Sequence, residues 1–386
     1  MAAGSVTYLD ANATTPADPR VAQAMFAALT ELPGNPSSDH MLGREARRAV
    51  EMARRDVAAL LGAERADEIV FTSGGSESNV TAIGAALAAR VGRREVITST
   101  VEHAAINATL DHLAALEGVV VRRVPVDRHG RLDLEAYRAA LGPQTALVTL
   151  MTANNETGTL FPIADLVPAA HAAGALFHTD AVQAAGRLAL DVTASGVDMA
   201  SISAHKLHGP KGVGALYVRR GTTFSSLITG GAQERGRRAG TENVPAIVGF
   251  GIASRLAQSG SEGGHIARLR GRLESEMVAA LPGTSVLGDH KARLPNTACL
   301  AFPGSDAEMM LHRLDRAGIA ASSGSACSAR GTAAPSHVLL AMGLRHLAGS
   351  TIRFSLSRFN TDADVDRLVE VLPSIAREAR ILETLA

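Results

Sequence analysis

Short apolar runs alternate along this chain with longer stretches whose apolar residues recur at helical spacing. In one such stretch near the N-terminus, an apolar side chain returns every three or four residues, at Leu42, Ala46, Ala49, Ala53, Val57 and Leu60. Gly62 predicts the end of that helix, because glycine readily adopts the left-handed conformation of a helix C-cap. Apolar runs bounded by polar residues predict strands at 68–72, 95–100, 118–124, 145–151, 175–179, 198–203 and 213–218. This alternation predicts an α/β fold with a mostly parallel central sheet.

A segment rich in glycine and serine, Ser259–Gly264, interrupts the alternation. Such a composition is typical of flexible linkers, and we place a domain boundary there. Beyond it the pattern predicts a helix, a strand near 297–302, a helix near 307–317, a strand near 351–356 and a closing amphipathic helix from Asp362. We expect a large domain over 15–258 and a smaller α+β domain formed by 1–14 and 259–386.

Composition excludes several classes of protein. The 386 residues are 46% apolar, which indicates a globular chain with two or three domains. Lys and Arg together number 38, as do Asp and Glu, so nothing in the charge favours nucleic acid or an anionic membrane. No apolar run is long enough to span a bilayer, and Asp10 stands where a signal peptide would be apolar, so we expect a cytoplasmic protein. The two cysteines cannot form a disulfide framework, and we expect no metal site.

Two apolar strands end in residues suited to pyridoxal phosphate. One is followed by Ser203-Ala-His-Lys206, and the other by Asp180-Ala-Val-Gln183. A lysine forms an imine with the aldehyde of this cofactor, and a carboxylate keeps its ring nitrogen protonated. Ser203 and His205 suit its phosphate, and Gln183 suits its ring hydroxyl. Taken singly, Lys206 reads as a surface lysine and Asp180 as a helix cap, but the paired strand ends favour a site.

Three further strand ends carry polar residues. Ser73-Gly-Gly-Ser76 joins a strand to a helix, and there Gly75 and Ser76 can present donors to a phosphate. His103 follows the strand at 95–100 and can stack on a planar ring, and Asn155 follows the strand at 145–151 and can donate to a ligand. Each pattern alone is more often a turn or a solvated side chain. Because the ligands of open α/β sheets lie at the carboxyl ends of strands, five such ends predict one site.

Two residues of the C-terminal part complete the candidate chemistry. Cys327 lies in a small, polar loop, Ser322-Ser-Gly-Ser-Ala-Cys327, where a thiol is accessible and needs a cationic or basic neighbour such as Arg330 or His103. Arg353 is a charge within an apolar strand and suits a bidentate grip on a carboxylate. Cys299 lies in an apolar run and is expected in the core. In a basic, glycine-rich loop, Thr241 can reach a phosphate.

The chain resembles the cysteine desulfurases of the nitrogen-fixation and iron–sulfur-cluster type, within the pyridoxal phosphate enzymes of the aspartate aminotransferase-like fold. The resemblance covers nearly the whole chain. It rests on these segments: Tyr8–Pro16, Phe71–Ser78, Thr100–His103, Asn154–Glu156, His178–Gln183, Ser203–Lys206, Arg238–Thr241, Ser322–Cys327 and Ser350–Ser355. The lysine segment fits several pyridoxal phosphate families, whereas the Ser-Ser-Gly-Ser-Ala-Cys loop is much more specific.

The resemblance implies that the enzyme converts L-cysteine to L-alanine. Lys206 then holds the cofactor and moves protons, Asp180 pairs with the ring nitrogen, Gln183 contacts the ring hydroxyl and His103 stacks on the ring. The implied phosphate ligands are Gly75, Ser76, Ser203 and His205, together with Thr241 from the partner of a homodimer. Asn155 and Arg353 would hold the substrate carboxylate. Cys327 would attack the substrate sulfur, carry it as a persulfide, and pass it to an acceptor protein.

Two segments depart from the family pattern. Gly74-Gly75-Ser76 replaces the Ala-Thr of many relatives but keeps a hydroxyl, and the stretch from Cys327 to Pro335 lacks the usual Leu-Glu. Two alternatives remain: another lyase or aminotransferase in which Cys327 is incidental, and a non-catalytic protein that binds a sulfur acceptor. The sequence does not identify the sulfur acceptor, which can belong to iron–sulfur assembly, tRNA thiolation, DNA phosphorothioation or a biosynthetic pathway. It also does not show how strongly the enzyme selects against selenocysteine.

Overall fold

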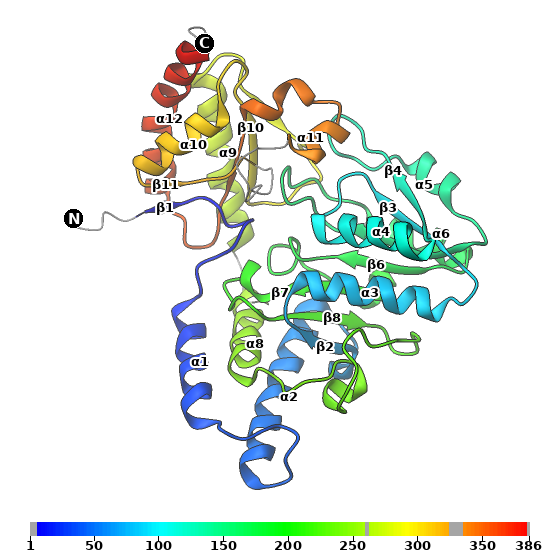
Figure 1. Cartoon of the computed structure of the whole chain (residues 1–386). Helices are drawn as coiled ribbons and strands as arrows, with labels where there is room; N and C mark the ends of the chain where they lie inside the picture. Colours follow the sequence, from blue (N-terminus) through cyan, green and yellow to red (C-terminus); the bar gives the residue numbers. More distant parts are fainter. Residues whose placement is uncertain (1–5, 259–261, 324–334, 384–386) are drawn as a thin grey trace.

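A seven-stranded sheet forms the centre of the protein (Figure 1). The computed structural model describes residues 6–258, 262–323 and 335–383. The strand order is β2-β8-β7-β6-β5-β3-β4; β8 runs antiparallel to both of its neighbours and the other adjacent pairs are parallel, so the predicted mostly parallel sheet is confirmed. The strands are β2 Ile69–Thr72, β3 Glu95–Ser99, β4 Val120–Val124, β5 Thr145–Met151, β6 Leu176–Asp180, β7 Met199–Ser203 and β8 Gly214–Val218.

Helices cover both faces of this sheet, which is why its inner strands are apolar runs rather than alternating ones. Alternate residues such as Val70, Leu147 and Met199 pack with α3 and α4 on one face. Their neighbours, such as Phe71 and Val148, face the opposite side and its helices. The helices of this part are α1 Pro19–Glu31, α2 Met41–Leu61, α3 Gly75–Ala89, α4 Ala104–Glu117, α5 Leu134–Ala140, α6 Ile163–Ala172, α7 Val192–Ser195 and α8 Val244–Gln258.

The C-terminal part has its own sheet and core, seen at the top of Figure 1. Strand order β12-β10-β9 is antiparallel, and a separate short pair, β1 with β11, is parallel. Leu9 from the N-terminal segment joins this core. The elements are β1 Thr7–Tyr8, α9 Glu262–Ala280, β9 Ser285–Leu287, β10 Thr297–Ala301, α10 Ala307–Arg316, β11 Ile319–Ala320, α11 His337–Ala341, β12 Thr351–Ser355 and α12 Asp362–Glu383.

The structure differs from the sequence pattern in a few places. Helix α9 begins at Glu262 and includes Gly263 and Gly264, which the composition places in the break before it. Glycine near a helix end costs little, so the helix extends through both. The short strands β1, β9 and β11 and the 3-10 turns were not expected, because two to six residues are too few to show a clear period. These turns are η1 Ala66–Glu68, η2 Ala204–Lys206, η3 Gln233–Gly236 and η4 Arg345–Ser350.

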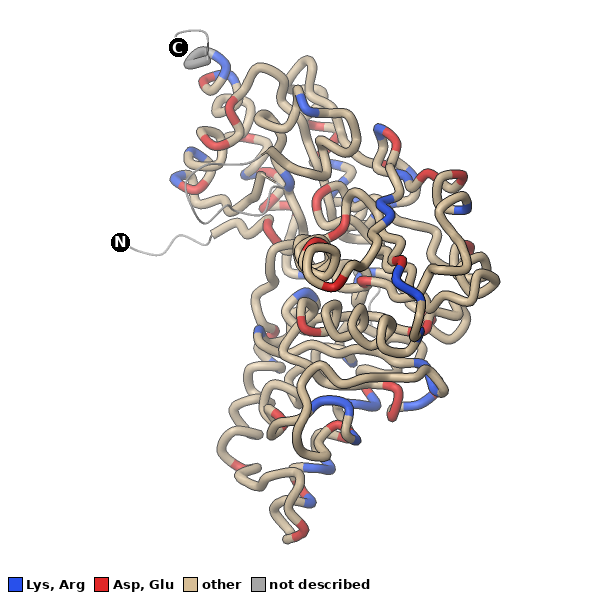
Figure 2. Tube along the Cα trace, turned by 45° about the vertical axis from the view of Figure 1, so that its right-hand side comes forward, with Lys and Arg blue, Asp and Glu red and all other residues tan. Residues whose placement is uncertain are grey.

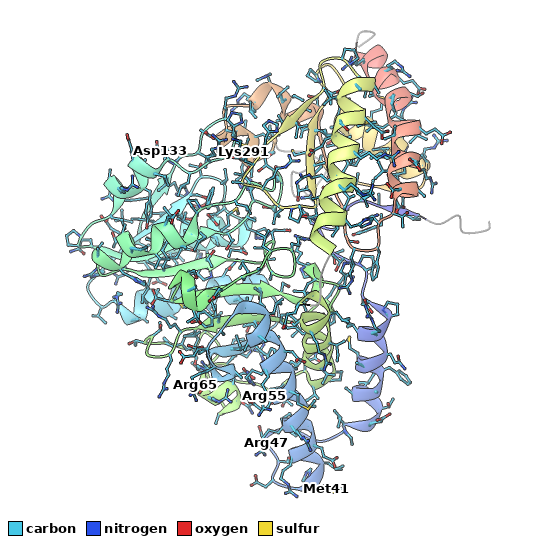
Figure 3. All side chains as sticks on the ribbon, turned by 180° about the vertical axis from the view of Figure 1, so that it is seen from behind. Met41, Arg47, Arg55, Arg65, Asp133 and Lys291 are labelled. Carbon is cyan, nitrogen blue, oxygen red and sulfur yellow. The ribbon has the colours of Figure 1, made fainter. Side chains whose placement is uncertain are left out.

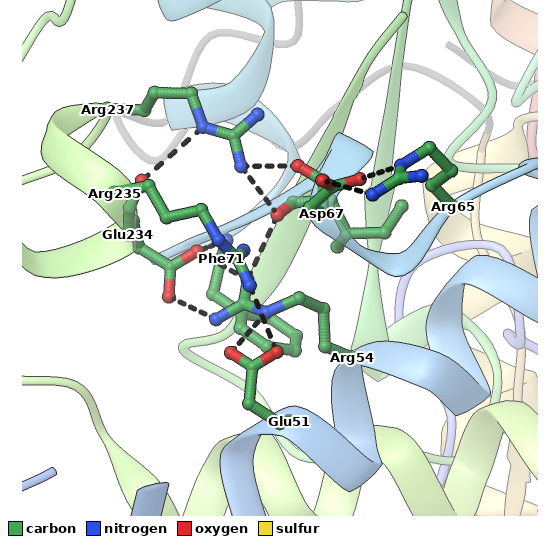
Figure 4. A network of polar contacts seen from close by, with 9 residues as sticks. Glu51, Arg54, Arg65, Asp67, Phe71, Glu234, Arg235 and Arg237 are labelled. Atoms are coloured by element: carbon green, nitrogen blue, oxygen red, sulfur yellow. Dashed lines mark hydrogen bonds and ion pairs between the residues drawn. The ribbon is translucent and has the colours of Figure 1, made fainter. Parts of the chain in front are cut away.

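A buried ion pair ties the loop that contains η3 to α2 and β2 (Figure 4). The Arg54 guanidinium donates to both oxygens of Glu234 at 2.6 and 2.8 Å, and Glu234 also accepts from the Phe71 backbone N–H at 2.8 Å. Glu234 and Arg235 have φ of 49° and 58°, the left-handed region that non-glycine residues rarely adopt. The bidentate pair therefore stabilises a strained turn in the loop leading to Thr241.

Residues of both charges are interspersed along the described chain. Figure 2 shows Lys and Arg positions scattered among Asp and Glu positions along the backbone. Figure 3 shows Arg47 and Arg55 extending outward from α2, whereas Arg54 of the same helix is 2% exposed. Within the described residues, none of the helices has the length and apolar character needed to cross a membrane.

Candidate active site

The carboxyl ends of five strands meet at one cavity of about 300 Å³. Strands β2, β3, β5, β6 and β7 each lead into residues that line it. The lining is Ala13, Gly75, Ser76, Asn79, His103, Met151, Ala153, Asn155, Asp180, Val182, Gln183, Ser203, His205 and Lys206. The structure thus brings nine of the residues singled out in the sequence to one place.

Lys206 ends the 3-10 turn after β7 and points at the N-terminal segment. Its Nζ donates to the backbone oxygens of Asn12 at 2.6 Å and Ala13 at 2.7 Å. Burial, followed by the nearby guanidinium groups of Arg187 and Arg353, lowers the pKa of this amine from 10.5 to about 7. A substantial fraction of Lys206 is therefore unprotonated at neutral pH, the form that attacks a carbonyl.

Asp180 ends β6 and is held by two donors. The Asn79 side-chain amide donates to Oδ2 at 2.7 Å, and the Val182 backbone N–H donates to Oδ1 at 3.0 Å. These bonds fix the carboxylate, which is 7% exposed, at the cavity. Asn79 was missed in the sequence, although it lies three residues after Ser76 and therefore on the same helix face.

The start of α3 forms the end of the cavity suited to an anion. Within the described part of the chain no side chain caps this helix, whose N-cap is Gly74, and this leaves its first amide groups available to a ligand. A Cβ at Gly75 would lie 2.7 Å from Cγ2 of Val182, so a larger residue here requires Val182 to shift. His205 Nδ1 contacts the Thr14 hydroxyl at 3.1 Å. Burial, aided by Lys206 and Lys211, lowers the pKa of His205 to about 4, so this ring is neutral at pH 7.

His103 and Gln183 border the cavity from two sides. His103 caps α4, its Nδ1 accepting from the Ala105 backbone N–H at 3.1 Å, and the residue is exposed. Gln183 Nε2 donates to the Asn12 backbone oxygen at 3.0 Å, while its Oε1 accepts from Arg187. Both side chains are thus positioned before any ligand binds.

Arg353 lies outside the lining of this cavity. It is 4% exposed, and it donates to the Asn155 backbone oxygen at 3.0 Å and to Asp10 Oδ1 at 2.7 Å. Asn155 does line the cavity, so Arg353 stands directly behind it. Its ion pair with Asp10 was not expected from the sequence.

The remaining candidates lie elsewhere. Thr241 is exposed and lines a different cavity, of about 250 Å³, with Ser73 and Arg238. Cys327 and Arg330 fall outside the described residues. Cys299 is buried, and burial raises the pKa of its thiol to about 12, so the expectation that it belongs to the core is confirmed. Among the described residues, no group of three or more His, Cys, Asp and Glu side chains could hold a metal ion.

The cavity fits pyridoxal phosphate by shape and by its donors. Its volume lies at the lower end of the range for ligand pockets. The uncapped helix start suits the phosphate, the fixed Asp180 carboxylate suits the pyridinium nitrogen, and the partly neutral Lys206 amine suits the aldehyde. The buried Oδ1 of Asn79 has no hydrogen-bond partner among the described residues, which leaves an acceptor beside Asp180.

The comparison with protein families agrees with this chemistry. Residues 7–368 match the family described as aminotransferase class-V. The chain therefore belongs to the class-V aminotransferases, a family of pyridoxal phosphate-dependent enzymes with the aspartate aminotransferase-like fold.

Individual relatives show which class-V enzyme this chain resembles. A cysteine desulfurase of Cereibacter sphaeroides is 56% identical over 97% of both chains. The cysteine desulfurase NifS of Azotobacter vinelandii is 49% identical over 97% of this chain and 93% of its own. The solved structure of a NifS-like protein superposes with a TM-score of 0.90 at 37% identity, covering 97% of this chain and all of the other. Within the class-V family, this chain is a cysteine desulfurase.

Proposed function

We propose that the protein converts L-cysteine to L-alanine in this cavity and passes the sulfur through Cys327 to an acceptor protein. The observation that carries the proposal is the convergence of Lys206, Asp180 and the uncapped start of α3 on one cavity. The cysteine desulfurases to which the chain is similar support the substrate.

We assign the cofactor contacts as follows. Asp180 holds the ring nitrogen, Gln183 the ring hydroxyl, and His103 the ring face. The phosphate is bound by Gly75, Ser76, Ser203 and His205. When bound, pyridoxal phosphate withdraws electrons from the α-carbon of the substrate and so makes its proton removable. Lys206 Nζ, whose pKa is lowered to about 7, takes this proton.

The sulfur step is assigned to Cys327. Its thiolate attacks the substrate sulfur, the Cβ–S bond of the substrate breaks, and an S–S bond forms on the enzyme. The bonding electrons of the broken Cβ–S bond stay with the carbon skeleton, which gains a proton at Cβ, regains one at Cα from Lys206 and leaves as alanine, so no outside oxidant is needed. Because Cys327 lies outside the described residues, this role rests on its sequence motif.

The direct test incubates the purified protein with pyridoxal phosphate and L-cysteine and measures alanine and protein-bound persulfide. We expect one persulfide per alanine in a single turnover. Cys327→Ala should bind the cofactor and lose the persulfide, and persulfide at the normal rate would remove Cys327 from its role. Lys206→Ala should lose turnover, and near-normal alanine production would contradict the lysine assignment.

We also propose a homodimer in which Thr241 completes the phosphate site of the partner subunit. Its absence from the lining of the Lys206 cavity, and its exposure beside Ser73, support a contribution to another subunit. Mixing Lys206→Ala and Thr241→Ala subunits tests this. If Thr241 acts across the dimer, each mixed dimer keeps one intact site and activity returns; if it acts within its own subunit, no site is intact.

The division into domains and the location of the protein stay predictions. We propose a large domain over 15–258 and a small domain over 1–14 and 259–386; the separate core around Leu9, α9, α10 and α12 supports this division. We also propose a cytoplasmic location. Capture of acceptors by the persulfidated protein from cell extract is the experiment that identifies the pathway.

A further inference from the structure

The guanidinium of Arg353 is already engaged by a carboxylate of the protein itself. Its Nη2 donates to Asp10 Oδ1 at 2.7 Å, and its Nη1 donates to the Asn155 backbone oxygen at 3.0 Å. The side chains of Arg353 and Asp10 are 5% and 20% exposed. The buried Nε of Arg353 has no hydrogen-bond partner among the described residues.

Asp10 is fixed at this place by its backbone. Its carbonyl oxygen accepts from the N–H of Ala13 at 3.0 Å and from Thr14 at 3.3 Å, and it forms a bridge with Ser355, two residues after Arg353. The same turn presents the oxygens of Asn12 and Ala13 to Lys206. The turn that holds the lysine therefore also carries the carboxylate that pairs with the arginine.

A ligand carboxylate has to compete with this internal pair. An α-carboxylate is gripped best by two parallel N–H groups of one guanidinium edge, and one donor of Arg353 is bound to Asp10 in the free protein. A second carboxylate must displace Asp10 or bind beside it against like-charge repulsion. Either way, the apparent affinity falls with the fraction of Arg353 that Asp10 occupies.

The ion pair between Asp10 and Arg353 also stabilises the protein without a ligand. A buried guanidinium without a counter-ion is costly, and Asp10 neutralises it. When the product leaves, the return of Asp10 restores this pairing. The aspartate thus stabilises the free protein and weakens binding of every ligand that carries a carboxylate.

We propose that Asp10 is a specificity-determining residue, whose carboxylate competes with the α-carboxylate of substrate and product for Arg353. The inference rests on the proposed function, because it takes Arg353 to be the carboxylate-binding residue. Asp10 is then a competing group supplied by the chain itself. It raises the Michaelis constant for L-cysteine and promotes the release of alanine.

The test uses Asp10→Asn and Asp10→Ser holoenzyme, with the charge-retaining Asp10→Glu beside them. Binding of L-alanine should tighten about three- to tenfold in Asp10→Asn, the range expected for losing a largely buried ion-paired competitor. The KM for L-cysteine should fall by a similar factor while kcat changes less. Ethylamine, which is alanine without its carboxylate, should bind all variants equally.

The controls separate charge from structure. Asp111→Asn removes an aspartate in an exposed pair with Arg123, far from the cavity lining, and should leave alanine binding unchanged. Thermal unfolding shows that each variant is folded; because asparagine and serine are no larger than aspartate, neither overpacks the site. Unchanged or weaker alanine binding in folded Asp10→Asn and Asp10→Ser overturns the inference.

The Arg353→Gln variant separates two possible errors: a wrong role for Asp10, and a wrong assignment of Arg353 as the residue that binds the substrate carboxylate. If Arg353→Gln still prefers L-alanine over ethylamine as the parent does, Arg353 does not bind the carboxylate, and both the assignment and the inference fall. If Arg353→Gln loses that preference while Asp10→Asn binds alanine no more tightly, only the role of Asp10 is wrong.

Discussion

Glu102 is a buried carboxyl group whose protonation can be measured through stability. Its side chain is fully buried, Oε1 accepts from the Ser99 hydroxyl at 2.7 Å and from the Met151 N–H at 3.0 Å, and Oε2 has no partner among the described residues. Burial raises its pKa from 4.5 to about 8; the two hydrogen bonds oppose this rise only in part, and the Asp180 charge adds a smaller rise. Glu102 therefore keeps its proton at neutral pH.

Replacing Glu102 with glutamine removes this titration while preserving the acceptor oxygen. The pKa of Glu102 is higher in the folded protein, about 8, than the ordinary value of 4.5 that it takes in the unfolded chain. The glutamate therefore contributes stability that is fully present below pH 4.5 and declines as the pH rises toward 8. Each pH unit in this window is worth about 1.4 kcal/mol. The free energy of unfolding of Glu102→Gln, relative to the parent, should therefore increase by about 3 kcal/mol between about pH 5.5 and pH 8.5.

Urea denaturation of the cofactor-free protein at four pH values in this range measures that difference. Other titrating groups, including Glu156, are present in both proteins and cancel. Glu117→Gln, which changes an exposed glutamate at the end of α4, is the control and should show no pH-dependent difference. If the difference in the free energy of unfolding between parent and Glu102→Gln stays constant over this pH range, Glu102 is not protonated at neutral pH.

Three further predictions follow from buried contacts. Arg54→Met should destabilise the protein by about 3–5 kcal/mol in denaturant titrations, because it leaves Glu234 buried without its cation, and adding Glu234→Met should recover part of the loss; no recovery contradicts the pairing. Gly75→Ala should weaken pyridoxal phosphate binding in equilibrium dialysis, because the new Cβ meets Val182. Unchanged affinity would contradict the assignment of the phosphate to the start of α3. Ser336→Ala should cost about 1–3 kcal/mol, as it removes the hydroxyl that donates to Glu156 at 2.5 Å and caps α11. Because Glu156 has a pKa raised to about 7 by burial, that loss should be larger above pH 7 than below it, as its charged form needs the donor more; a loss independent of pH contradicts this reasoning.

The sequence predicts the strands and the residues at their ends because both are local signals. Strands β5 to β8 are buried at every position and rich in apolar residues, and polar residues at the end of a strand or within a few residues after it mark the sheet edge. That rule alone locates His103, Asn155, Asp180 and Lys206 at one cavity. The family resemblance adds the roles.

The contacts that position those side chains have no such local signal. Asp10 and Arg353 are 343 residues apart in the chain, and Arg54 and Glu234 are 180 apart. A charged residue reads as solvated unless its partner is known, since Asp and Arg are rarely fully buried without one. The pairs become visible only when the fold has brought their elements together.

The N-terminal turn over residues 10–14 belongs to the active site as much as the strand ends do. It supplies the two carbonyl oxygens that hold Lys206 Nζ, the hydroxyl that meets His205, and the carboxylate that pairs with Arg353. Arg353 lowers the pKa of Lys206, and Asp10 opposes that effect. A substrate carboxylate at Arg353 would offset the same positive charge that Asp10 offsets in the free protein. The proposed exchange therefore keeps a negative charge at Arg353, and that charge opposes the lowering of the Lys206 pKa by the guanidinium.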